Sequence, residues 1–163
     1  MSTTINRRVL IVEDDAPKLE AIKDYLRTDI NIDTPEIAKS LTSAIQQISR
    51  KSFDLCIIDM SIPTYDFDAD KSGGDPQSKG GVEILRYIQS ESPKTKAIII
   101  TQYDEFPEGN GSVTLEELTS QLLIKFKNNL LAVLFYASQK SEWRNKLKYT
   151  IYGGYNEDQD SHI

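Results

Sequence analysis

The stretch LCIIDMSIP, residues 55–63, joins a continuous apolar run to a carboxylate at its end. A short run that is apolar at every position is typical of a strand buried on both faces of a parallel sheet. Asp59 would then stand at the carboxyl end of a buried strand. Functional sites of open α/β sheets form at this edge, so the stretch indicates both a fold class and a place to look for function.

The same kind of apolar run recurs along the chain, separated by helical patterns. A weaker extended piece at 34–38 contains Pro35, which favours a sheet edge. The further apolar runs are 9–12, 97–100 and 130–136. Between the runs, apolar residues recur every three or four positions, as in Leu19, Ile22 and Leu26, Leu41, Ala44 and Ile48, Val82, Leu85 and Ile88, Leu115, Leu118 and Leu122, and Trp143, Leu147 and Ile151. Strand and helix alternate five times, which predicts an α/β fold with a parallel sheet and right-handed crossovers.

Composition limits the classes of function. The chain has 163 residues, which predicts one domain, and a net charge of −6, which opposes direct nucleic-acid binding. No apolar run approaches the roughly 20 residues that span a bilayer, and the N-terminus lacks the layout of a signal peptide. With Cys56 as the single cysteine, inside an apolar run, we expect a cytoplasmic protein with no membrane partner. We expect a domain over 1–152 and a polar, flexible tail over 153–163.

Acidic and hydroxyl residues follow the strongest predicted strands. Glu13 and Asp14 end the first run, Asp59 ends the second and Thr101 ends the third. If the first two strands are neighbours, three carboxylates converge and repel one another, and a hard divalent cation such as Mg²⁺ relieves the repulsion. The alternative is that such acids cap the following helices, as Asp15 before Pro17 is expected to do.

These residues carry a resemblance to a known family. The segments VLIVEDDAPKLEAIKDYL, FDLCIIDMSIP and AIIIT resemble the receiver domain of bacterial two-component response regulators, and the resemblance covers about residues 7–152. It implies a flavodoxin-like (βα)5 three-layer sandwich, with a parallel five-stranded sheet in the order 2-1-3-4-5.

The resemblance also implies roles for individual residues. Asp59 matches the phosphoacceptor, Asp14 the direct Mg²⁺ ligand, and Glu13 an acid that acts on the metal largely through water. Ser61 would offer its backbone carbonyl to the metal. Thr101 matches the switch hydroxyl that binds the phosphoryl group.

The end of the last strand departs from the family pattern. The family has a lysine followed by proline there, and the lysine pairs with the phosphoryl oxygens; here the chain reads FYASQKS over 135–141. The lysine position falls nearest Tyr136 or Ser138. Lys140 could reach the site on its long stem, or be a solvated residue before a helix. Gln102, after the switch threonine, replaces a residue that is usually small.

A long polar segment follows the acceptor strand. Residues 64–80 form an insertion of about fourteen residues relative to the family, long enough to be functional or disordered. Lys71 and Gln77 replace the glycine and glutamate of a calcium loop, although the alternating aspartates resemble the start of one: Asp66, Asp68 and Asp70. A lid or docking loop and a plain insertion remain alternatives.

Three functions follow as hypotheses. The leading one is a stand-alone receiver that takes a phosphoryl group onto Asp59 from a sensor histidine kinase or phosphotransfer protein and then binds an output protein. It would be a signalling phosphoacceptor that catalyses phosphoryl transfer to itself from a donor, rather than a conventional turnover enzyme. Its last two helices could form a homodimer face. A pseudo-receiver, which binds proteins without a phosphate switch, is the alternative. A haloacid-dehalogenase-type phosphatase needs a second aspartate where Ser61 stands.

Overall fold

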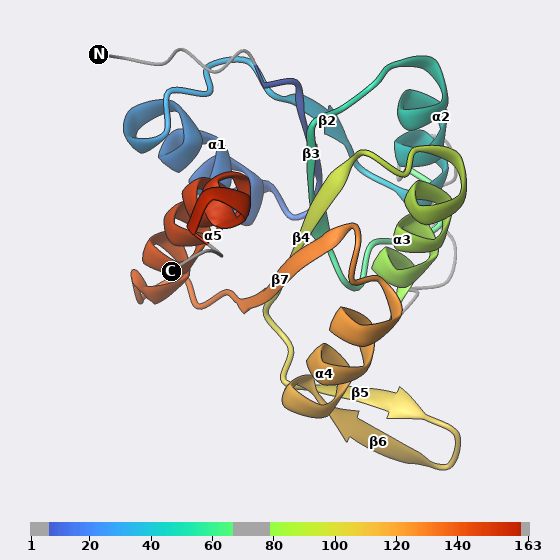
Figure 1. The fold of residues 1–163 in the computed structure, drawn as a ribbon. Helices are drawn as coiled ribbons and strands as arrows, with labels where there is room; N and C mark the ends of the chain where they lie inside the picture. The colour runs from blue at the N-terminus through green and yellow to red at the C-terminus, as the bar shows by residue number, and fades with distance from the viewer. Residues whose placement is uncertain (1–6, 67–78, 161–163) are drawn as a thin grey trace.

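A five-stranded parallel sheet forms the centre of the protein (Figure 1). The computed structural model describes residues 7–66 and 79–160. The spatial order is β2-β1-β3-β4-β7, and every strand pairing in this sheet is parallel. The strands are β1 (Val9–Val12), β2 (Glu36–Ala38), β3 (Leu55–Asp59), β4 (Lys96–Thr101) and β7 (Leu130–Phe135). The predicted α/β fold and strand order 2-1-3-4-5 are confirmed, with β7 as the fifth strand and β2 at an edge.

Helices cover both faces of the sheet and bury the central strands β1 and β3. α1 and α5 lie on one face, and α2, α3 and α4 lie on the other (Figure 1). Along β1, Val9 and Ile11 pack with α1 and α5, whereas Leu10 and Val12 pack with the opposite helices. This double burial explains the continuous apolar runs of the central strands, VLIV in β1 and LCII in β3. The helices are α1 (Ala16–Asp29), α2 (Leu41–Arg50), α3 (Gly80–Glu91), α4 (Leu115–Lys125) and α5 (Glu142–Asp160).

The start of α1 is set immediately after the acidic end of β1. Asp15 is the N-cap, and its carboxylate accepts a hydrogen bond from the Lys18 amide at 3.0 Å. Pro17, in the first turn, costs no intrahelical hydrogen bond there. The predicted cap is confirmed, and it fixes the first turn of α1 beside the carboxyl edge of the sheet.

Gly81 lets α3 approach the end of β3 closely. Its amide donates to the Met60 carbonyl at 2.8 Å. A Cβ atom at this position would lie 2.9 Å from the Asp59 carbonyl oxygen and 3.0 Å from the Met60 Cα. The backbone at the end of β3 therefore leaves no room for a side chain at Gly81.

A two-stranded antiparallel hairpin, which the sequence analysis missed, lies between β4 and α4 (Figure 1). It consists of β5 (Glu105–Glu108) and β6 (Gly111–Thr114). Gly109 has a φ of 58°, a left-handed conformation that glycine adopts without strain. Phe106 and Val113 are directly opposite and buried in the core, so the hairpin is anchored to the main body.

The predicted insertion and the predicted C-terminal tail are only partly described by the structure. Within the 64–80 insertion, residues 67–78 lie outside the described residues, and most of the calcium-like pattern lies there with them. The predicted tail begins at Gly153, but the backbone of α5 continues as a helix to Asp160. Among the helices of the described residues, none has the length and apolar character needed to cross a bilayer.

Candidate functional site

The three predicted acids meet at the carboxyl edge of the sheet. Val12 and Ile58 are partners in the β1–β3 register, so Glu13 and Asp59 follow side by side. Glu13, Asp14 and Asp59 each offer a carboxylate oxygen within 4.8 Å of the others. Glu13 and Asp59 are buried, and Asp14 is exposed. The cluster is therefore closed toward the core and open toward solvent at Asp14.

Burial and the nearby charge of Asp59 oppose ionisation of Glu13 and Asp14. Burial is the largest cause that raises the pKa of Glu13 to about 7; the Asp59 charge adds to the shift, and Lys18 opposes it. Burial, followed by the charge of Asp59, also raises the pKa of Asp14. A bound divalent cation would favour the ionised carboxylates, so the donor set and its electrostatics fit Mg²⁺.

Two further predicted site residues lie at the same edge. Thr101 is the last residue of β4 and is completely buried, and its hydroxyl accepts a hydrogen bond from the Tyr103 amide at 3.2 Å. Asp59 pairs with Ile100 in the β3–β4 register, so Thr101 is one position beyond the acid's partner. Ser61 is half-buried in the turn after β3. Its role as a carbonyl ligand stays a prediction.

Lys18, which the sequence analysis did not identify, is in the middle of the site. Its side chain is only 1% exposed, and its Nζ lies 2.8 Å from Glu13 Oε1 and 3.2 Å from Asp59 Oδ1. The same amine donates to the Ile100 carbonyl and to the Gln102 side-chain oxygen, both at 2.9 Å. One ammonium group thus joins β1, β3 and the end of β4.

A signal for Lys18 was present in the sequence. Lys18 shares a helix face with Ile22, Tyr25 and Leu26, four, seven and eight positions further on, and all four are buried. A lysine on the apolar stripe of a helix needs a buried partner, because an unpaired charge in the core is costly. The acids at the end of β1 and β3 are those partners.

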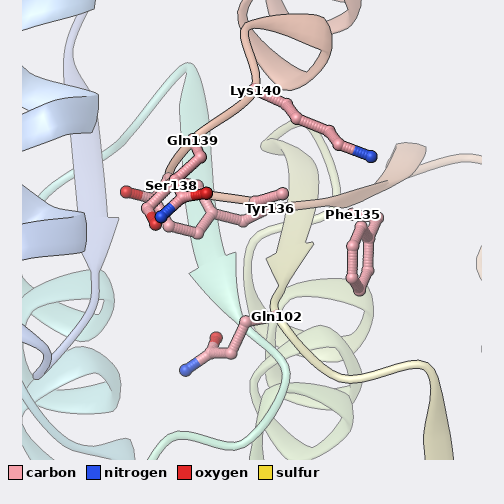
Figure 2. Close-up of a pocket in the computed structure, with 7 residues that line it drawn as sticks. Gln102, Phe135, Tyr136, Ser138, Gln139 and Lys140 are labelled. Carbon is pink, nitrogen blue, oxygen red and sulfur yellow. The ribbon is translucent and has the colours of Figure 1, made fainter.

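Lys140, the predicted phosphoryl partner, lies on the loop between β7 and α5. It is exposed, and it lines a pocket together with Gln102, Phe135 and Tyr136. Figure 2 shows its amine on the Phe135 side, whereas the Gln102 amide points away from it. Tyr136, at the position nearest the missing strand-end lysine, instead has its ring 5.7 Å from the Lys18 amine. A phosphoryl-binding role for Lys140 stays a prediction.

The family assignment follows from comparison with known proteins. The family model of the response regulator receiver domain matches residues 9–116, which is more than half of the chain. The chain belongs to the response regulator receiver domain family. This receiver contains the acids and the strand order that the sequence predicts, and it adds the β5–β6 hairpin.

Relatives and solved structures are similar to this receiver over most of its length, and the solved structures share its fold. The protein y4jR of Sinorhizobium fredii is 25% identical over 142 residues, covering 86% of this receiver and 94% of the relative. The Detocs response regulatory protein DtcB of Enterobacter cloacae is 20% identical, covering 86% and 95%. A CheY-like receiver domain from Methanospirillum hungatei has a TM-score of 0.60 at 19% identity, covering 95% and 98%. The signal receiver domain of an HD domain-containing protein from Pseudomonas fluorescens has a TM-score of 0.60 at 16% identity, covering 94% and 98%.

Proposed function

We propose that this receiver accepts a phosphoryl group on Asp59, with Mg²⁺ held by Glu13, Asp14 and Asp59. The observation that carries the proposal is the carboxylate cluster, whose oxygens lie within 4.8 Å of one another at the carboxyl edge of the sheet. When bound, Mg²⁺ would neutralise the negative charge that gathers between the carboxylates and the phosphoryl oxygens. The Ser61 carbonyl is the proposed backbone ligand.

The transfer step needs a nucleophile at a defined place. One carboxylate oxygen of Asp59 forms a bond to phosphorus, and the bond from phosphorus to the donor's leaving group breaks. The donor is a phosphohistidine on a sensor kinase or phosphotransfer protein, or a small acyl phosphate. The product is an aspartyl phosphate. Asp59 is buried and its carboxylate lies within 4.8 Å of that of the exposed Asp14, so a donor would approach from the Asp14 side.

Thr101 is the proposed link between phosphorylation and output. It pairs with Phe135 in the β4–β7 register, and Phe135 is 46% exposed beside the groove between α4 and α5. The Thr101 hydroxyl accepts from the Tyr103 amide, so its own O–H could donate to a phosphoryl oxygen, and a rotation toward that oxygen would weaken the bond from the Tyr103 amide. The face formed by α4, β7 and α5 would then repack and present a changed surface to an output protein.

A pseudo-receiver is the second candidate, and one observation favours it. The Lys18 amine already pairs with Glu13 and Asp59, so a protein cation neutralises part of the cluster. In that case the acids would serve stability and the module would bind partners without a phosphate switch. It predicts no Mg²⁺-dependent modification of Asp59.

Intact mass separates the two candidates. We would incubate the receiver with acetyl phosphate and Mg²⁺, beside an Asp59→Asn variant and an EDTA control. The receiver hypothesis predicts a gain of one phosphoryl group that is lost in both controls. No gain from acetyl phosphate or from a phosphorylated kinase, with Mg²⁺ binding confirmed by calorimetry, would favour the pseudo-receiver.

A further inference from the structure

Lys18 is a buried ammonium group with a complete set of oxygen partners. An ammonium has three N–H donors, and four oxygens surround this one: Glu13 Oε1, Asp59 Oδ1, the Ile100 carbonyl and Gln102 Oε1. Burial of a charge at 1% exposure is tolerated only when the charge is paired in this way. The chain therefore places a buried cation next to Asp59, the proposed phosphoacceptor.

We infer that Lys18 is the phosphoryl-binding cation of this receiver. The positive charge that the family pattern places at the end of the last strand would here come from the first turn of α1. This inference rests on the proposed phosphorylation of Asp59. Among the described residues, Lys18 is the cation that pairs with Asp59, at 3.2 Å. Tyr136, nearest the family's lysine position, packs its ring 5.7 Å from the same amine.

The lysine can serve the transfer without giving up its proton. As an Asp59 oxygen bonds to phosphorus, the bond to the leaving group breaks and the phosphoryl group keeps two negative charges. Acetyl phosphate would release acetate, so charge and atoms balance without proton transfer. The ammonium of Lys18 then shifts from the Asp59 oxygen to a phosphoryl oxygen on a flexible four-carbon stem. This contact strengthens as the phosphoryl group arrives, which is the property that accelerates a reaction.

Gln102 is a positioning residue for this lysine. Its side-chain oxygen and the Ile100 carbonyl accept hydrogen bonds from the amine at 2.9 Å each. These two neutral acceptors hold the ammonium at the end of β4 and leave its remaining donor for the acids. The family usually has a small residue at position 102. The larger amide of Gln102 is explained here by its hydrogen bond to Lys18, which extends from α1.

The competing account makes Lys18 a structural counter-ion that only neutralises the acids. Rates and affinities measured on Lys18→Met separate the two accounts, with Lys23→Met as the matched control. Lys23 is on the same helix, but it is partly exposed and pairs with Glu20. A counter-ion role changes the Mg²⁺ affinity and the melting temperature but leaves the transfer rate at saturating Mg²⁺ unchanged.

The experiment follows phosphoryl incorporation from acetyl phosphate by intact mass at saturating Mg²⁺, with Mg²⁺ affinity from calorimetry. We expect Lys18→Met to bind Mg²⁺ at least as tightly as the wild type and to incorporate phosphoryl about 100-fold more slowly. Lys23→Met should match the wild type. Adding Tyr136→Lys to Lys18→Met returns a lysine from the strand end, and it should restore at least tenfold of the rate.

The outcomes keep the two proposals distinct. A wild-type rate in Lys18→Met would overturn the role of Lys18 and leave phosphorylation of Asp59 standing. A wild-type protein that accepts no phosphoryl group would overturn the proposed function, and the inference about Lys18 with it. If Lys18→Met does not fold, Gln102→Leu at the exposed position 102 takes its place. Its rate should fall about fivefold, and an unchanged rate would contradict the positioning role.

Discussion

The two parts of the sheet's carboxyl edge differ in how closely they follow the receiver pattern. At β1 and β3, the chain has the acids in the expected order, and the structure brings Glu13, Asp14 and Asp59 together. At β7, the strand ends in FYASQKS without the expected lysine, and Tyr136 occupies the nearest position. The site nevertheless contains a buried lysine, which comes from α1.

We infer from this difference that the site requires a cation at a particular place in space, and not at a particular position in the sequence. Carboxylate ligands must come from adjacent strand ends, because only the sheet register holds several short side chains within 4.8 Å. A lysine stem is long and flexible, so the ammonium can reach the same place from a different element. The acids are therefore the less replaceable part of the site.

Removal of one proposed metal ligand should give the largest effect. Asp14→Asn would leave the proposed cation one carboxylate short, and we expect Mg²⁺ affinity to fall at least about 100-fold. Because burial and Asp59 raise the pKa of Asp14, loss of its charge should not lower the melting temperature in EDTA. Calorimetry and thermal unfolding check both parts. Asp15→Asn is the matched control, since asparagine keeps the helix cap; equal Mg²⁺ affinities in the two variants would contradict the assignment.

A methyl group at Gly81 should disturb the β3 end through packing alone. The Cβ of Gly81→Ala would meet the Asp59 carbonyl at 2.9 Å, and we expect a loss of about 1–3 kcal/mol in the free energy of unfolding. Gly111→Ala is the control, because its Cβ would have its nearest neighbour at 4.0 Å. Urea denaturation compares the two. If Gly81→Ala is as stable as Gly111→Ala, α3 does not pack against the end of β3 as closely as described.

The acid cluster should make Mg²⁺ binding depend on pH. The pKa of Glu13 is raised from 4.5 to about 7, so protons compete with the cation below neutrality. We expect Mg²⁺ affinity to fall by up to tenfold per pH unit below about pH 7 and to level off above it. The stability of the metal-free protein depends on pH in the opposite direction. The contribution of Glu13 to the free energy of unfolding is present below about pH 4.5 and is lost as the pH rises through about 7.

Calorimetry and thermal melts between pH 5 and 8, each with and without Mg²⁺, test this pair of trends. Glu13→Gln removes the titrating group and should flatten both profiles. A wild-type affinity that stays constant from pH 5 to 8 would show that Glu13 is already ionised in the free protein.

The smallest effect is expected at Lys140. Its side chain is exposed and points away from Gln102, so Lys140→Ala should phosphorylate within about twofold of the wild type, as for other surface substitutions. Time courses with acetyl phosphate measure the rate. A large loss in Lys140→Ala, with Lys18→Met unaffected, would reverse the comparison and place the cation at the β7 end as the sequence first suggested.

The acids and the sheet could be predicted because both depend on local, periodic signals. Continuous apolar runs that end on Glu13 and Asp59 indicate buried parallel strands and carboxylates at one edge, and the structure agrees. Lys18 could not be placed in the same way, because two of its partners, Asp59 and Ile100, lie 41 and 82 positions away in the sequence. Its place on the apolar face of α1 was the available signal.

The β5–β6 hairpin was missed for a different reason. Its strands have four residues each, and Pro107 in the middle of β5 argues against a strand. The structure explains the hairpin in two ways. A two-stranded hairpin has only edge strands, which tolerate a proline, and Phe106 is buried against the core. Glycine at 109, with its positive φ, was the local signal for the turn.

The most direct test of the central claim is to locate the modified residue. After incubation with acetyl phosphate and Mg²⁺, borohydride reduces an aspartyl phosphate to homoserine, and peptide mass spectrometry shows where homoserine has formed. We predict homoserine at position 59, in the wild type and, at a strongly reduced level, in Lys18→Met. Homoserine at another aspartate, or none at position 59 in a wild-type protein that binds Mg²⁺, would contradict the account.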